Sequence, residues 1–285
     1  MSENVVDLPA ATRPGRVAIA VEDLYGTSSF YEDVVGLDLF DYTESSGTLG
    51  VDAKPLVELL DGSDRGPRTD SQAGLYHVAF KYPSRAALGA ALLRTESFYE
   101  LDGATDHGVT HSLYLTDPAG NGVELYTETP RAEWPRNEAG EVVMETDSLD
   151  LDALRVAADP EGAAPAGTRI GHFHLEVTDL DGSTAFYRDR LGLPVSRKIG
   201  EMARFFATGA AHHHLGVTNY LGRTEPATGR GLDWIEFVVP AVGAIEAARA
   251  RFEAANEPVE EIAGGIRVVD PDGIGVQLRV ENEGE

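Results

Sequence analysis

Residues 15–37 read GRVAIAVEDLYGTSSFYEDVVGL, and residues 171–193 read GHFHLEVTDLDGSTAFYRDRLGL. The two stretches start 156 residues apart and are identical at ten of 23 positions, which indicates an internal repeat of one structural unit. Each copy begins with an alternating strand, continues through an Asp-Leu pair that offers a helix cap, and stops at a glycine. The repeat therefore predicts two copies of a strand followed by a short helix.

A second repeat predicts a β-hairpin at the end of each half. Residues 113–126 read LYLTDPAGNGVELY, and residues 266–279 read IRVVDPDGIGVQLR. In the first copy, residues 112–116 and 123–127 have the alternation of strands on either side of a DPAGNG turn. Each copy follows a strand that ends in proline, YHVAFKYP or DWIEFVVP, and then an alanine-rich helix.

Together the repeats predict an α+β protein of four βαβββ modules that form two open β-barrel domains. The modules begin at about residues 16, 75, 170 and 231. Domain 1 is expected at residues 15–127 (modules one and two), and domain 2 at residues 170–281 (modules three and four). Residues 128–169, rich in Pro, Ala, Asp and Glu, are expected to link them and to contain a short helix at residues 149–158.

Composition excludes several classes of function. The 285 residues include no cysteine, so disulfides, thiolate ligands and a cysteine nucleophile are excluded. The net charge of −25 comes from 23 basic and 48 acidic residues, and such a field repels nucleic acid and anionic membranes. No apolar run approaches the roughly 18 residues of a membrane span, and the first residues lack a signal-peptide pattern. We expect a cytoplasmic protein adapted to high salt.

The histidines indicate a cation site. All eight lie between residues 77 and 214. His77 begins the strand YHVAFKYP, and His172 and His174 share one face of the strand GHFHLEV. Three histidines at 212–214 enter the strand HHHLGV, and Glu124 lies on the returning strand of the hairpin. One such histidine is more often structural than a ligand, but four strands that each bring a histidine or glutamate at one end favour a metal site.

Alignment of the modules shows which of them keep this chemistry. At the equivalent first-strand position modules two and three have histidine, whereas modules one and four have arginine and tryptophan. At the last-strand position module two has glutamate and module four has glutamine. We therefore predict a metal site between modules two and three. The aligned residues are Arg16, His77, His172 and Trp234 on the first strands, and Glu124 and Gln277 on the last strands.

These motifs resemble the vicinal oxygen chelate superfamily, and within it the two-domain extradiol ring-cleavage dioxygenases of the catechol 2,3-dioxygenase type. The resemblance covers nearly the whole chain. The stretches GLYHVAF, IGHFHL and HHHLGVTN look like the site strands of that family. The long family signature is matched without a gap by Thr105-Asp106-His107, Leu113-Tyr114, Asp117-Pro118, Gly120 and Glu124.

The resemblance implies a non-haem Fe(II) centre, with Mn(II) as the alternative metal, held by two histidines and one carboxylate. By motif position the implied ligands are His77, Glu124 and His172. The partners would be a small aromatic diol and dioxygen, and the product a ring-opened semialdehyde. A homo-oligomer is left open.

The same resemblance implies three catalytic residues. His213 matches the acid/base histidine beside the dioxygen site, and His107 and Tyr114 match the residues that hydrogen-bond the substrate oxygens. His174 and His214 are expected to support these residues or to be structural. Residues 111 and 212, also histidines, are expected at the surface.

One departure from the family concerns the location of the site. In the better-known two-domain extradiol enzymes the last two modules hold the metal, which here would require Trp234 and Gln277 as ligands. Indole can only donate a hydrogen bond, and a neutral amide replaces a carboxylate poorly at iron. The ligand count therefore predicts that modules two and three enclose the site and that modules one and four pair without metal.

Two other functions are compatible with the fold. A glyoxalase-like lyase or isomerase would need a fourth protein ligand, usually glutamate, and the corresponding strand HHLGVTN offers no acid. A ligand-sequestering protein of the same fold would need no metal triad. Iron content and dioxygen uptake with catechol separate these alternatives from a dioxygenase.

The charge predicts a salt-dependent stability. We expect the melting temperature to rise as KCl is raised from about 0.1 M to molar concentration, because the Debye length falls from roughly 10 to 3 Å and self-repulsion is screened. Thermal unfolding followed by circular dichroism measures this. A melting temperature that stays constant over that range would contradict adaptation to high salt.

Overall fold

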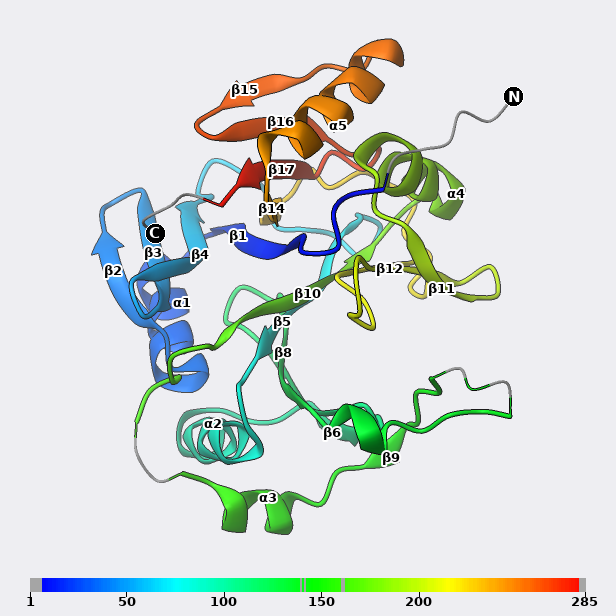
Figure 1. Ribbon diagram of the computed structural model, residues 1–285. Helices are drawn as coiled ribbons and strands as arrows, with labels where there is room; N and C mark the ends of the chain where they lie inside the picture. Colours follow the sequence, from blue (N-terminus) through cyan, green and yellow to red (C-terminus); the bar gives the residue numbers. More distant parts are fainter. Residues whose placement is uncertain (1–6, 139, 141, 160–161, 282–285) are drawn as a thin grey trace. The chain divides into compact units, whose positions relative to one another are not determined.

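The computed structural model describes residues 7–138, 140, 142–159 and 162–281 (Figure 1). The protein has a two-domain α+β fold in which four copies of one module follow each other along the chain. Its residues form two compact units, Met1–Glu22 with Leu60–Tyr76 and Gly171–Glu285, and Asp23–Leu59 with His77–Ile170. No helix among the described residues is both long enough and apolar enough to cross a bilayer.

Modules one and two have the predicted strand, helix and three further strands. Module one consists of β1 (Arg13–Val21), α1 (Leu24–Phe30) with a π-helical turn (Tyr31–Val35), β2 (Asp38–Tyr42), β3 (Ser46–Val51) and β4 (Lys54–Asp61). Module two consists of β5 (Gly74–Lys81), α2 (Arg85–Phe98), β6 (Gly103–Asp106), β7 (Thr110–Thr116) and β8 (Gly122–Glu128). The connection that follows contains a 3₁₀ turn (Arg131–Glu133), β9 (Asp147–Ser148) and α3 (Leu151–Ala157).

Modules three and four repeat the pattern. Module three consists of β10 (Arg169–Glu176), α4 (Leu180–Thr184) with a π-helical turn (Ala185–Leu191), β11 (Val195–Ile199), β12 (Ala203–Phe206) and β13 (Leu215–Thr218). Module four consists of β14 (Gly231–Val239), α5 (Val242–Ala254), β15 (Glu260–Ile262), β16 (Gly265–Val269) and β17 (Gly275–Val280). The hairpin and the short helix predicted before module three are confirmed by β7, β8 and α3.

The module topology brings the first and last strands side by side. β5 pairs in parallel with β8, β10 with β13, and β14 with β17. A parallel pair needs a crossover connection, and in each of these modules a helix and two further strands provide it. Residues far apart in sequence, such as those on β5 and β8, are thereby placed at neighbouring positions of one sheet.

The first strands of modules one and four are also neighbours. β1 and β14 pair antiparallel from Arg13 opposite Val238 to Ala20 opposite Gly231, with two register shifts between these ends. Modules at opposite ends of the chain thus share one sheet. The domain boundaries expected at 15–127 and 170–281 stay a prediction.

The helix signals of the first repeat are confirmed. The Asp23 side chain accepts a hydrogen bond from the Gly26 amide, and Asp179 caps the equivalent helix in module three. Gly36 and Gly192 end these helices at φ angles of 84° and 95°, a left-handed conformation that glycine adopts without steric cost. The sequence did not predict that both helices widen into a π-helical turn before the glycine.

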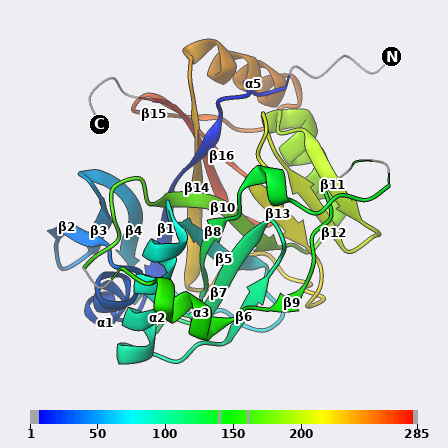
Figure 2. The ribbon, with the colours of Figure 1, turned by 60° about the horizontal axis from the view of Figure 1, so that its bottom comes forward.

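Close backbone approach positions the helix after β9. α3 lies against α2 (Figure 2). At Gly89 of α2, a Cβ atom would lie 2.6 Å from the Leu154 carbonyl oxygen of α3. A side chain at this position would force the two helices apart, so the glycine is needed for this contact.

The tyrosines of the repeated Phe-Tyr pairs brace the two Asp-Pro turns. Tyr31 donates a hydrogen bond to Asp117 (3.3 Å), and Tyr187 donates one to Asp270 (2.9 Å). The other oxygen of each aspartate accepts the amides two and four residues later. All four side chains are buried. These contacts join the helix of module one to the hairpin of module two, and that of module three to the hairpin of module four.

Asp270 predicts a pH-dependent stability. Burial raises the pKa of Asp270 to about 7, whereas an unfolded aspartate titrates near 3.9. The native state then holds the proton more tightly, so the stabilisation is complete below about pH 4 and is lost as the pH rises through about 7. We expect Asp270→Asn to flatten the dependence of the free energy of unfolding on pH. The contribution of Asp270 to that slope amounts to at most about 1.4 kcal/mol per pH unit. Urea unfolding between about pH 4 and 8 measures it; parallel curves for parent and variant would exclude this role.

Candidate metal centre

The central pair of the candidate site lies on the parallel strands β5 and β8. His77 is near the start of β5, and Glu124 is on β8 opposite Ala79. The Nε2 atom of His77 lies 3.1 Å from Oε2 of Glu124. Their exposed fractions are only 8% and 4%. A carboxylate buried to this degree needs a donor or a cation beside it to remain charged.

A second cluster consists of histidines at the start of β10 and just before β13. His172 is 3% exposed, and its ring centroid lies 4.2 Å from that of His213, which is also buried. The Nδ1 atoms of His212 and His213 are 2.5 Å apart, so one of the two must carry a proton and donate it to the other. His111 and His212 were expected at the surface; both are instead half-buried, and His212 lies beside His213.

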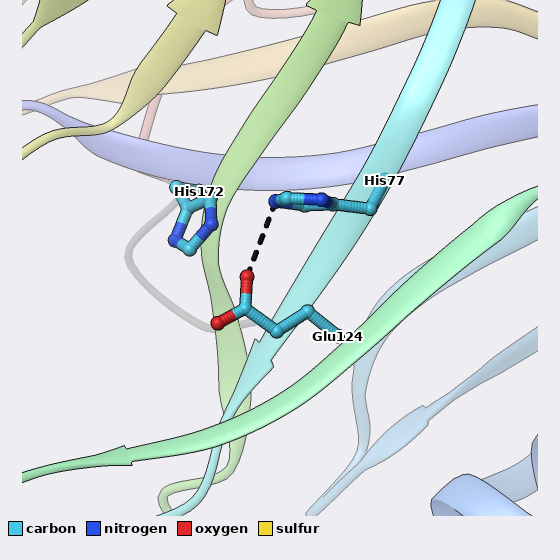
Figure 3. A group of neighbouring side chains, drawn as sticks. All are labelled: His77, Glu124 and His172. Carbon is cyan, nitrogen blue, oxygen red and sulfur yellow. Dashed lines mark ion pairs between the residues drawn. The ribbon is translucent and has the colours of Figure 1, made fainter. Parts of the chain in front are cut away.

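Three of the six predicted site residues form a compact group. One possible ligand atom from each of His77, Glu124 and His172 lies within 4.8 Å of the others (Figure 3). All three side chains are buried, and Figure 3 shows them directed toward one another. Within the described part of the chain no second group of three histidine or acidic side chains meets this criterion. Two imidazoles and one carboxylate are a donor set that suits a divalent transition metal.

Two more of the predicted residues lie beside Glu124. Tyr114 on β7 is directly opposite Glu124 in the antiparallel pair β7–β8, and its ring centroid is 6.0 Å from that of His77. The Tyr114 hydroxyl lies 3.0 Å from Nε2 of His107. The Nδ1 atom of His107 is 2.8 Å from the carbonyl oxygen of Glu145. A tyrosine and a histidine thus form a hydrogen-bonded pair next to the buried carboxylate.

An aromatic side chain that was not predicted packs against the histidines. Phe205 on β12 has its ring centroid 5.1 Å from His213 and 5.7 Å from His174. His174 also contacts Tyr76 and Tyr220 edge-on. The sequence ARFF around residue 205 does not reveal which phenylalanine faces the histidines. Only the structure identifies Phe205 as the one that packs against them.

Modules one and four have an ion pair beside the positions equivalent to the proposed ligands. The Arg16 guanidinium bonds the buried Glu236 carboxylate at 2.9 Å and lies 5.4 Å from the centre of the Trp234 ring. Arg279 also contacts Glu236 at 3.4 Å, and Gln277 lies opposite Glu236 on β17. Here a fixed internal cation balances the buried acid, and the residues that would replace the metal ligands offer neither imidazole nor carboxylate.

Comparison with known proteins identifies the family. The model of the Glyoxalase/Bleomycin resistance protein/Dioxygenase superfamily matches residues 13–125 and 169–278. The chain belongs to this superfamily. It is 34% identical over 268 residues to catechol-2,3-dioxygenase of Bacillus subtilis (strain 168), covering 91% of this chain and 94% of that relative.

Two further similarities are weaker. Biphenyl-2,3-diol 1,2-dioxygenase 3 of Rhodococcus globerulus is 27% identical over 160 residues, which covers 54% of this chain and 84% of the relative. The crystal structure of glyoxalase I from Zea mays superimposes with a TM-score of 0.59 at 20% identity, covering 95% of this chain and 92% of that one. The structural likeness shows the superfamily fold, and the sequence relatives are dioxygenases by name.

Proposed function

We propose that this protein is an extradiol ring-cleavage dioxygenase. It would open a catechol-type aromatic ring with dioxygen at a non-haem Fe(II), or at Mn(II) as the alternative, and release a ring-opened semialdehyde. The observation that carries the proposal is the buried group of His77, Glu124 and His172. The 34% identity to a catechol-2,3-dioxygenase over nearly the whole chain supports the choice of reaction.

The donor set fits the metal that the reaction requires. His77 and His172 would supply neutral imidazole nitrogens, and Glu124 would supply the anionic oxygen, a donor set that suits non-haem iron. When bound, Fe(II) supplies the electron transfer that allows dioxygen to react with an aromatic diol. Because the three side chains are buried, they would hold such a metal away from bulk water, in surroundings where the attraction between charges is stronger.

Tyr114 and His107 would position the substrate. Their hydrogen-bonded pair lies beside Glu124, so a diol oxygen bound there would meet the Tyr114 hydroxyl. Orientation of the substrate by such a bond is a usual source of rate enhancement.

His213 would act as the acid and base. It packs against the proposed ligand His172, and the short contact to His212 gives it a neighbour with which to share one proton. A histidine of this kind can accept a proton from the substrate and return it to the developing product. The bulky Phe205 beside it would keep that exchange away from bulk water.

The alternatives are separated by one assay. A glyoxalase-like enzyme of this fold would isomerise or cleave its substrate without consuming dioxygen, and a ligand-sequestering protein would bind without turnover. We expect the purified protein to contain iron and to take up one dioxygen per catechol opened. Metal-replete protein that binds catechol but takes up no dioxygen would refute the dioxygenase proposal. A cytoplasmic location and the oligomeric state stay predictions.

Replacing Glu124 tests the anionic ligand. We expect Glu124→Gln to fold normally but to lose tightly bound metal and ring cleavage, because a neutral amide is a poor ligand for iron. Metal content by atomic absorption, with circular dichroism as the folding control, measures this. Trp234→Phe, at the module-four position equivalent to His77, should keep the metal. Equal iron occupancy in Glu124→Gln and the parent would disprove the assignment.

Replacing His213 separates acid–base chemistry from metal binding. We expect His213→Phe to retain iron and catechol binding while turnover falls by roughly 100- to 10,000-fold, the scale of a positioned acid/base. Steady-state kinetics and metal analysis provide the two readouts. His111→Phe serves as the matched control, because His111 bonds Arg85 instead. Loss of iron in His213→Phe would make His213 a ligand.

A further inference from the structure

The connection after β8 folds back onto the turn that carries His107. The Thr129 amide donates to the Val109 carbonyl at 3.0 Å, and its hydroxyl donates to the Gly108 carbonyl at 2.7 Å. Farther along, β9 pairs antiparallel with β6, and Asp147 lies opposite Asp106. This segment, which the sequence predicted as a link between two domains, is therefore hydrogen-bonded to the residues that precede and follow His107.

Glu145 continues this pairing and makes two bonds with His107. Its amide donates to the His107 carbonyl at 3.0 Å, and its carbonyl oxygen lies 2.8 Å from Nδ1 of the His107 ring. A carbonyl oxygen can only accept, so Nδ1 must carry the hydrogen. In the neutral ring Nε2 is then the acceptor, and the Tyr114 hydroxyl 3.0 Å away must donate to it.

We infer that Glu145, through its main chain, is a positioning residue that fixes the tautomer of His107. The tautomer decides whether the Tyr114 hydroxyl accepts a hydrogen bond from a bound ligand or donates one to it. With Nδ1–H, the Tyr114 hydrogen is committed to His107, and its oxygen faces the substrate as an acceptor, which suits a substrate hydroxyl that donates. With Nε2–H, Tyr114 would have to accept from His107 and would turn its own hydrogen to the substrate.

This inference deepens the proposed function and rests on it for the identity of the ligand, a diol with a free hydroxyl. It does not rest on the side chain of Glu145, because both bonds are made by backbone atoms. Removing a hydrogen-bond partner that orients a site residue typically changes activity by roughly 10- to 100-fold.

The direct test is ¹⁵N NMR of the full-length, metal-free protein labelled at histidine. We expect His107, assigned by the signal lost in His107→Gln, to be in the Nδ1–H form when neutral. Glu145→Pro removes the amide and restricts the preceding residue, so this signal should shift toward a tautomer mixture. Glu145→Ala keeps both main-chain bonds and should keep the parent tautomer. Glu138→Pro, at an exposed turn of the same segment, is the matched proline control.

Kinetics of the iron-loaded enzyme provide the second readout. For Glu145→Pro we expect kcat/KM for catechol to fall by roughly 10- to 100-fold, with metal content unchanged. An Nε2–H tautomer in the parent would overturn the inference, even if Glu145→Pro fails to fold. A parent-like tautomer in Glu145→Pro, or an altered one in Glu145→Ala, would also overturn it. If the tautomer results hold but catechol is not cleaved, the proposed function fails and the positioning by Glu145 stands.

Discussion

The buried carboxylate of Glu124 is the constraint on which the proposed site depends. A charged group with 4% exposure has lost most of its hydration, and the remaining cost must be offset by partners of opposite charge or by hydrogen-bond donors. His77 at 3.1 Å is one such partner, and a divalent metal shared with His172 would be a stronger one. A bound metal would then stabilise the fold as well as serve the proposed reaction, because it would balance a buried charge.

The repeated modules balance a buried acid in two different ways. In module four, Glu236 is held by Arg16 and Arg279, so the compensating charge is part of the chain and always present. Where module one has Arg16, modules two and three have His77 and His172, whose imidazoles could bind an external cation beside Glu124. The repeated module thus permits a closed ion pair between modules one and four and, in the proposed function, a ligand set in modules two and three.

The parallel pairing inside each module explains why ligands can come from distant parts of the sequence. β5 and β8 are separated by α2 and two strands, yet they are neighbours in the sheet, so a histidine at the start of one lies near a glutamate on the other. This arrangement requires a long crossover connection between the two strands, and the connection must be held in place for the strands to pair in register. The buried Tyr31–Asp117 and Tyr187–Asp270 contacts fix the helix of one module on the turn of the next. The bonds of Thr129 and Glu145 and the pairing of β9 with β6 hold the turn that carries His107.

The sequence by itself determined the α+β class, the repeated modules and the hairpin around Asp117, and it singled out the six residues of the proposed site. These follow from local signals: alternation, Asp caps, glycine stops and a long motif around His107 and Glu124. It could not determine the π-helical turns, the contact of His212 with His213, the packing of Phe205 against the histidines, or the hydrogen bonds of Glu145. Those depend on which side chains and backbone groups meet when the chain folds back on itself, and a period-two pattern specifies a face of a strand but not its neighbour across space. The tertiary structure alone decided them.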